Sequence, residues 1–560
     1  MLEMMPPDAK KKLQEQFGPL AVREVPKFHI QFPKQCGLPV SDPGCRRQCQ
    51  QLLQEAYANA LTCPWMSEWA MQTGEMQFDE ASLVKRYNGL LGAEWHAKHP
   101  HLKPGSIIRA REEMEKQRYS ELIRTSFCNH ACRREILHKG TTHVAVGFND
   151  LGLLLSCEMR DEPSKNMLGP LRFIGLDASA YSVAKTKVVA EMLKRDIPLN
   201  HVLQVWFSST CSKAAARNFA DAAKAVARNV DHQQVKSFLS HWVACANVPL
   251  LEARKLWLAT REGRNGTDIT SMKREKDQLR MCQYFLTGDV FDSEQPEVGN
   301  PSMWSVPDGS PPIARGESAF NAVDVDDLVE GPKKDNIAKC LVKVLLQRLQ
   351  RLRESIQKGL IRVELLCEFV EADAPIAKWI AEQRPWTMSW SNVLDYMAPA
   401  HFHKLARDCS VHGDTVHYAY SMNWIAEVVG TCILDYADLG QRKQIIEAAH
   451  QTLDETSRIA PAGRLLLLPP HDSPLNTTGY LLSMALHKQW TKYFFDPKFT
   501  GREVQVQVGV ASLQTYNPLA TNPTTLSLTW TYDGSIQLQG TAGSSFADDP
   551  FDSLPDCPVS

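Results

Sequence analysis

Residues 171–195 read LRFIGLDASAYSVAKTKVVAEMLKR, and this stretch decides the fold class. Its first seven residues form a short apolar run that ends in Asp177, which predicts a buried strand. The residues after Ser179 repeat apolar side chains at helical spacing, which predicts a helix. A strand that runs directly into a helix is the repeating unit of a parallel α/β sheet.

The same rhythm continues on both sides of this stretch. Residues 142–159 and 201–209 have strand-like patterns, and residues 212–230 predict a helix. Further on, 387–397 and 415–424 predict strands, while 503–513 and 524–534 alternate and predict an antiparallel pair. The expected fold class is therefore α/β: a Rossmann-like, mostly parallel sheet with antiparallel C-terminal strands, a helical N-terminal segment and a helical insertion.

Composition divides the chain into six segments. We expect a helical N-terminal segment (1–140), the first half of the core with its insertion (141–287), a flexible Gly- and Pro-rich loop (288–335), a basic amphipathic helix (336–369), the second half of the core (370–540) and a disordered acidic tail (541–560). The helix predicted over 336–369 carries an apolar stripe from Leu341 to Val363. Its many cations indicate a possible protein partner, although such charges are often simply solvated beside a core-packed stripe.

Composition also excludes some classes of protein. The 560 residues carry a formal net charge of -2 with 43% hydrophobic residues, so neither wholesale disorder nor nucleic-acid binding by bulk charge is expected. The 15 cysteines are scattered, which suits reduced thiols in a cytoplasmic protein. We expect no signal peptide and no transmembrane segment.

The strand end at Asp177 is the first candidate binding position. A carboxylate at the carboxyl edge of a parallel sheet lies where ligands bind in such folds, and Ser179 follows it at the start of the helix. The competing interpretation is that Asp177 only caps this helix.

The second candidate is the turn after the preceding strand. It contains Gly147, Asp150 and Gly152, and the glycines would allow a close approach of backbone to a ligand. Asn149-Asp150 equally fits a hairpin turn between two strands.

The third candidate lies after the strand at 387–390. Asn392 could hydrogen-bond an acceptor, Tyr396 could stack on a ring, and Asp395 lies between them. The alternative is a strand end with an Asx turn.

These elements resemble a known family. Parallel strands closed by an antiparallel pair, with the Gly147–Gly152 turn and the FIGLDAS motif around Asp177, resemble a divergent Rossmann-like methyltransferase domain. They are faintly similar to the uncharacterised domain family of dynein axonemal assembly factors and MYND-finger proteins. The resemblance covers about residues 141–290 and 370–535.

The resemblance implies S-adenosylmethionine as cofactor and an unknown acceptor. Asp177 would then hold the ribose, the Gly147–Gly152 loop would lie near the methionine part, and Asn392 to Tyr396 would face the acceptor. A non-catalytic scaffold or assembly factor that keeps the fold without the cofactor is the alternative.

Other catalytic and metal signatures are weak. The chain has no phosphate loop, H-E-x-x-H or G-x-S-x-G motif. Three loose groups of Cys and His do not have the spacing of a common zinc finger, so no metal is expected. These groups are Cys128/His130/Cys132/His138/His143, Cys36/Cys45/Cys49/Cys63 and His401/His403/Cys409/His412/His417.

Overall fold

The computed structural model describes residues 135–160, 169–259, 335–410, 413–421, 486–510 and 526–533, together with short stretches and single positions in 280–307 and 424–445. Most of the helical N-terminal segment, the strand that the sequence predicts over 463–470 and the tail lie outside these residues. Of the helix that the sequence predicts over 477–495, residues 486–494 are described, and they are helical. None of the described helices is long and apolar enough to cross a membrane.

A seven-stranded mixed sheet organises the fold, in the order β11-β12-β10-β9-β2-β4-β8. Its strands are β2 (Thr142–Val146), β4 (Leu171–Asp177), β8 (Ile361–Cys367), β9 (Thr387–Ser389), β10 (Val416–Ser421), β11 (Val506–Val510) and β12 (Leu526–Trp530). The strands from β8 to β10 are parallel, and β12 pairs antiparallel with both β10 and β11. The α/β class and the antiparallel C-terminal pair are thus confirmed.

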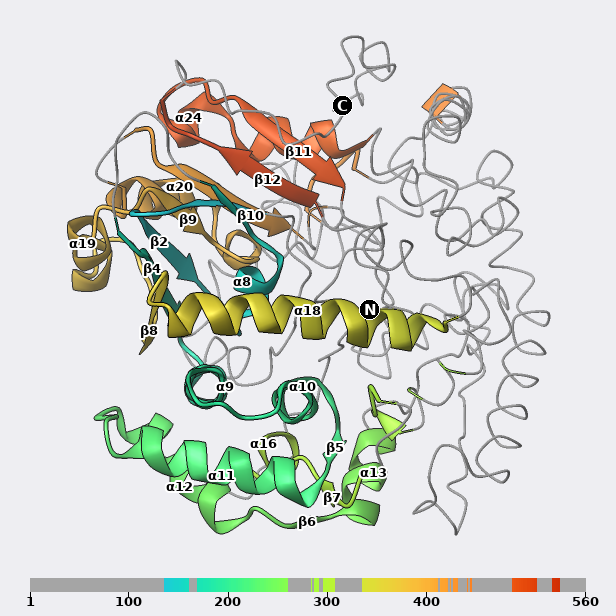
Figure 1. The fold of residues 1–560 in the computed structure, drawn as a ribbon. Helices are drawn as coiled ribbons and strands as arrows, with labels where there is room; N and C mark the ends of the chain where they lie inside the picture. The colour runs from blue at the N-terminus through green and yellow to red at the C-terminus, as the bar shows by residue number, and fades with distance from the viewer. Residues whose placement is uncertain are drawn as a thin grey trace.

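Helices cover both faces of the sheet (Figure 1). One face packs against α8 (Gly152–Ser156), α9 (Ala180–Lys194), α10 (Leu199–Phe207) and α18 (Ile337–Gln357). The other packs against α19 (Pro375–Glu382) and α20 (Pro399–Asp408), near α24 (Pro497–Thr500). Successive residues of β4 point to opposite faces of the sheet. Phe173 packs in the core on the α9 side, and Ile174 packs in the core on the α20 side.

Smaller elements extend the first face. The helices α11 (Lys213–Ala227), α12 (Gln233–Ala244) and α13 (Leu250–Ala259) lie beyond α9 and α10 (Figure 1). The short strands β5 (Thr210–Cys211), β6 (Val248–Pro249) and β7 (Val298–Gly299) form a three-stranded antiparallel sheet beside α16 (Pro301–Trp304). Separately, β1 (Ile136–His138) pairs parallel with β3 (Glu158–Arg160).

Three expected elements are wrong in detail. Residues 201–209 are expected as a strand, but 201–207 belong to helix α10. Residues 202–207 are all buried, so the sequence carries no alternation that would tell a strand from a helix. The segment 142–159 is not a hairpin: β2 is followed by helix α8 and only then by β3. The helix expected up to His138 is replaced there by β1.

The basic helix expected over 336–369 is shorter than its pattern suggested. It ends at Gln357, and 361–367 form the edge strand β8. Gly359 has a φ of 68°, a left-handed conformation that stops a helix at little cost for glycine. The segment 288–335, expected as a flexible loop, also contains packed structure, since Val298 and Met303 are buried.

Candidate functional site

The parallel strands end together at one edge of the sheet, where the chain reverses its order. It adds β4 and β8 on one side of β2 and then places β9 on the other side. A crevice at such a switch point is the usual ligand position in open α/β sheets. Gly147 follows β2 and Ser391 follows β9, and a Cβ built on Gly147 would lie 3.5 Å from the Ser391 Cβ. The structure therefore brings the two predicted loops together.

The loop after β2 has an unusual backbone. Gly147 has a φ of 66° and Asn149 a φ of 59°. Ser391, on the adjoining loop, has a φ of 51°. Left-handed non-glycine residues cost free energy, and they tend to gather where a binding loop must keep a special shape. Two such residues therefore lie on the two loops that meet at the switch point.

Asp150 holds this loop to the neighbouring helix. Its Oδ1 accepts from the backbone N–H of Gly152 at 2.7 Å, and its Oδ2 accepts from Nε1 of Trp206 at 2.9 Å. Gly152 is the first residue of α8. The second glycine of the predicted turn thus starts a helix, while Gly147 alone supplies the left-handed turn.

Asp177 lies at the end of β4 and joins two loops. Its Oδ2 accepts from the backbone N–H of Asn149 at 3.0 Å, and its Oδ1 accepts from that of Ser179 at 2.8 Å. Helix α9 itself is capped by Ser179, whose side chain accepts from the N–H of Ser182. Burial raises the pKa of the Asp177 carboxyl to about 6, although both backbone hydrogen bonds oppose that rise.

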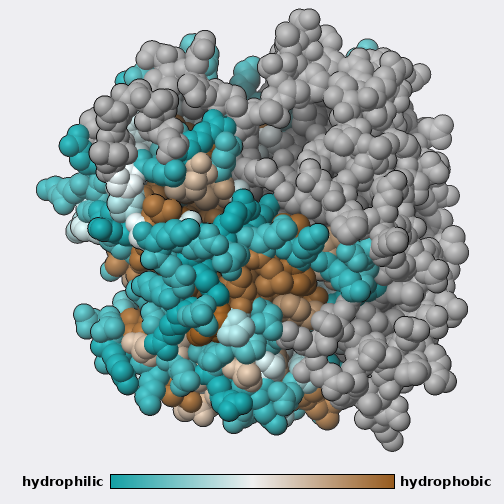
Figure 2. Space-filling model, in the orientation of Figure 1, coloured by the Kyte–Doolittle hydropathy of each residue, from teal (hydrophilic) through white to brown (hydrophobic). Residues whose placement is uncertain are grey.

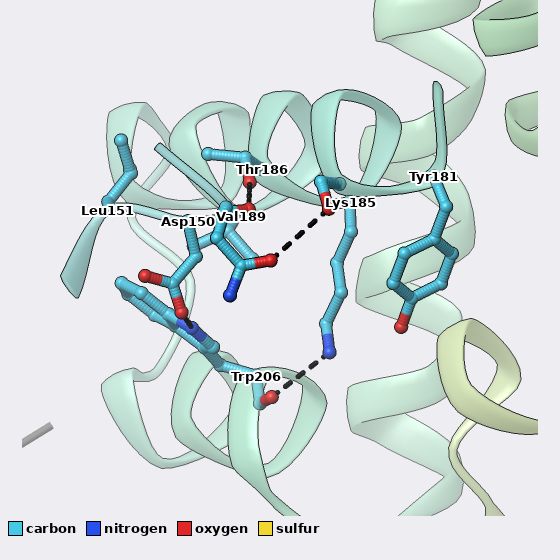
Figure 3. Close-up of a pocket in the computed structure, with 9 residues that line it drawn as sticks. Asp150, Leu151, Tyr181, Lys185, Thr186, Val189 and Trp206 are labelled. Atoms are coloured by element: carbon cyan, nitrogen blue, oxygen red, sulfur yellow. Dashed lines mark hydrogen bonds between the residues drawn. The ribbon is translucent and has the colours of Figure 1, made fainter. Parts of the chain in front are cut away.

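A small hollow lies between the β2 loop, α9 and α10 (Figure 3). Its volume is about 10 Å³, which is room for roughly one water molecule. Nζ of the buried Lys185 points into it and donates to the Trp206 carbonyl at 3.2 Å. Thr186 Oγ1 donates to the Asn149 carbonyl at 3.2 Å, which fixes the loop from its other side.

Sequence reasoning missed Lys185 and Trp206. Trp206 lies in a segment whose pattern predicts a strand, and nothing local marks either residue as a neighbour of the β2 loop. The contact between Trp206 and Asp150 spans 56 positions along the chain, so only the tertiary fold creates it.

The loop after β9 places its three predicted residues differently. Asn392 Nδ2 donates to the Tyr396 hydroxyl at 3.3 Å, so these two lie together and half-buried. Asp395 is fully buried and accepts from Ser421 Oγ at 2.5 Å. Ser391 Oγ and the Tyr420 hydroxyl lie 2.7 Å apart beside them. Asn392 and Tyr396 therefore lie nearer to solvent at the edge, and Asp395 supports the loop from the core.

His143, His403 and His417 are buried and act as hydrogen-bond partners inside the cores. His143 Nδ1 lies 2.7 Å from Thr387 Oγ1, and His403 Nδ1 lies 2.7 Å from the Tyr532 hydroxyl. His417 Nδ1 accepts from Trp390 Nε1. Among the described residues, no group of three or more His, Cys, Asp and Glu could hold a metal ion. Most of the first Cys/His group and all of the second lie outside those residues.

Comparison with protein-family models, with curated proteins and with solved structures found no match for this chain.

Proposed function

We propose that this chain is a methyltransferase-like protein that binds S-adenosylmethionine at the switch point between β2 and β9; the acceptor is unknown. The observation that carries the proposal is the convergence of Gly147, Asp177 and Ser391 at neighbouring carboxyl ends of the sheet. A parallel sheet closed by an antiparallel pair is also the arrangement that the sequence resemblance implies.

The side chains at this edge fit an adenosyl ligand. Each oxygen of Asp177 accepts one backbone N–H and keeps a further lone pair for a ribose hydroxyl. A carboxyl pKa of about 6 leaves Asp177 mostly ionised at neutral pH, which makes it an acceptor. The Gly147–Gly152 loop would lie near the methionine part, and Asn392 and Tyr396 would face the acceptor.

S-Adenosylmethionine would supply an activated methyl group, and the protein's contribution would be to hold and orient its two substrates. Methyl transfer to a good nucleophile needs little acid–base help, so proximity and orientation would carry most of the rate enhancement. The rigid β2 loop, held by Asp150, Trp206 and Thr186, suits that role.

Titration calorimetry with S-adenosylmethionine and S-adenosylhomocysteine tests the proposal. Micromolar binding, about -8 kcal/mol, is expected for the wild-type chain. Asp177→Asn should weaken binding at least tenfold, or about 1.4 kcal/mol, because it removes the charged acceptor. The affinity should also fall as pH drops below about 6, where the carboxyl becomes protonated.

Glu191→Gln is the matched control, because Glu191 lies on the surface of α9 and pairs with Arg195. This variant also removes one carboxylate, yet its affinity for S-adenosylmethionine should equal that of the wild type. The proposal fails if the wild type shows neither heat nor thermal stabilisation with either ligand.

A second function is favoured by one specific observation: both oxygens of Asp177 already accept backbone N–H groups of its own chain. The fold would then serve as a non-catalytic scaffold or assembly factor that binds a protein through α18. We propose a cytoplasmic location for either function, supported by the six free cysteines among the described residues.

A further inference from the structure

The charged face of α18 remains on the surface while its apolar face is covered. Leu341, Leu345 and Leu349 are fully buried in the core shared with α9 and α10. Lys339, Lys343, Arg351 and Lys358 are exposed. Figure 2 shows the resulting hydrophilic band along the helix. The apolar stripe is therefore used by the fold, and the cations are what the helix offers to a partner.

This band is strongly unbalanced in charge. Glu354 is the only acidic residue in α18, and its Oε2 lies 3.5 Å from Nζ of Lys358. The other three exposed cations therefore outnumber the acids of this helix. Lys339 and Lys358 are about 28 Å apart along the axis at 1.5 Å per residue. A small anion cannot span that distance, whereas an extended or helical polypeptide can.

A groove runs beside the band. It has a volume of about 730 Å³ and lies between α18 and the segment 154–159. Its lining is mixed: Met159 and Leu360 are apolar, and Leu360 is 45% exposed, whereas Gln347, Glu158 and Glu354 are polar. Arg351 and Lys358 stand on its rim. An occupant that fits would place an apolar side chain against Met159 and Leu360 and acidic side chains along the cations of the helix.

We propose that α18 and this groove form a docking surface for an acidic amphipathic polypeptide segment. The proposal deepens the partner-binding role given to α18 above and does not depend on cofactor binding. An anionic membrane fits less well, because the apolar face that would insert is buried in the core. Nucleic acid fits less well too, because none of the described lining residues is an aromatic platform for stacking bases.

Fluorescence anisotropy with the full-length chain and a labelled synthetic peptide tests the surface. The probe is an amphipathic helical peptide of about 20 residues, with leucines on one face and glutamates on the other. A second peptide carries lysine in place of every glutamate. The acidic peptide should bind at least tenfold more tightly than the basic one, and added salt should weaken its binding.

Variants of the chain locate the site. The double variant Lys343→Glu/Arg351→Glu should weaken binding of the acidic peptide at least tenfold, and Leu360→Ser should weaken it roughly threefold to tenfold by removing an apolar contact. The matched control Arg217→Glu/Lys224→Glu reverses two exposed cations on α11 and should leave the affinity unchanged. Thermal unfolding confirms that each variant is folded.

The proposal is overturned if the acidic peptide does not bind or if the two peptides bind alike. Equal loss in the α18 and α11 double variants would overturn it as well, because it would indicate attraction by net charge alone. Binding of S-adenosylmethionine is measured separately, so failure of the docking surface and failure of the cofactor site are distinguishable.

Discussion

Asn300→Ala is expected to lower the free energy of unfolding by about 3–5 kcal/mol. Asn300 is fully buried at the start of α16. Its Nδ2 donates to the carbonyls of Val205 at 2.7 Å and Ser208 at 2.9 Å, and its Oδ1 accepts from the backbone N–H of Ser302 at 3.1 Å. Alanine would leave these groups buried without this partner, which costs more than the hydrogen bonds contributed.

Asn336→Ala is the matched control for this prediction. Asn336 is also the cap of a helix, α18, and its side chain accepts from the N–H of Lys339 at 3.0 Å, but it lies near the surface. Its loss should cost only about 1 kcal/mol. Urea unfolding followed by tryptophan fluorescence measures both, with the buried Trp304 as a nearby reporter. Equal destabilisation by the two variants would contradict the role given to Asn300.

The region around Asn300 has a loop-like composition and yet is packed. Residues 288–335 are rich in glycine, proline, serine and aspartate, which is typical of loops. In the fold, a glycine of this segment lies where two elements pack closely together. A Cβ built on Gly299 would lie 2.5 Å from the Cβ of Ala253, so only glycine fits between β7 and α13. Turn-forming residues can therefore mark close packing as well as an open loop.

The central part of the fold was predictable because local and tertiary signals agree there. The strand before Asp177 and the helix after Ser179 carry a buried run, a cap and helical spacing in sequence. The pattern of 201–209 failed because a run buried on all sides has no period to read. Gly359 is a local stop signal, but the apolar spacing continues past it to Leu360 and Val363, which lie beyond the helix and in β8.

The candidate site was predictable only at its strand ends. Strand ends place Gly147, Asp177 and Asn392 at one edge, and local sequence shows where strands end. The orientation of Asp395 towards the core, by contrast, depends on Ser421 of the neighbouring strand β10. The residues next to Asp395 in the sequence therefore do not predict the orientation of its side chain.

Glu135 is a buried acidic residue. Glu135 lies behind β2 and β9, where Ser389 Oγ donates to its Oε2. His143 Nε2 lies 3.2 Å from Ser389 Oγ and 3.8 Å from Glu135 Oε2. Burial raises the pKa of Glu135 from 4.5 to about 8 and lowers the pKa of His143 from 6.5 to about 3. Both groups are therefore neutral in the folded protein at pH 7.

These pKa values give opposite pH dependences of stability. Between pH 4.5 and 8 the folded state holds the Glu135 proton that the unfolded chain has lost, so stability falls as pH rises. Between pH 3 and 6.5 the unfolded chain instead binds more protons at His143, so stability rises with pH. Below pH 6.5 the two groups change the free energy of unfolding in opposite directions. Above pH 6.5 only Glu135, of these two, makes it depend on pH.

Glu135→Gln is therefore expected to remove a loss of stability between pH 6.5 and 8. Over this window the Glu135 contribution amounts to about 2 kcal/mol, at 1.36 kcal/mol per pH unit. Glutamine keeps an acceptor for Ser389 Oγ but has no proton to lose. Urea unfolding at several pH values should show that the variant is increasingly more stable than the wild type as pH rises.

Glu364→Gln separates this effect from the loss of any carboxylate. Glu364 lies on the edge strand β8 and accepts a hydrogen bond from Arg172 of β4. That hydrogen bond lowers the pKa of the Glu364 carboxyl. A group ionised in both states above pH 6.5 binds no extra proton on folding, so this variant should keep the wild-type slope between pH 6.5 and 8. If Glu135→Gln and the wild type have parallel profiles there, Glu135 is ionised in the folded protein. A protonated His143, whose Nε2 lies 3.8 Å from Glu135 Oε2, would then balance that carboxylate as a buried ion pair.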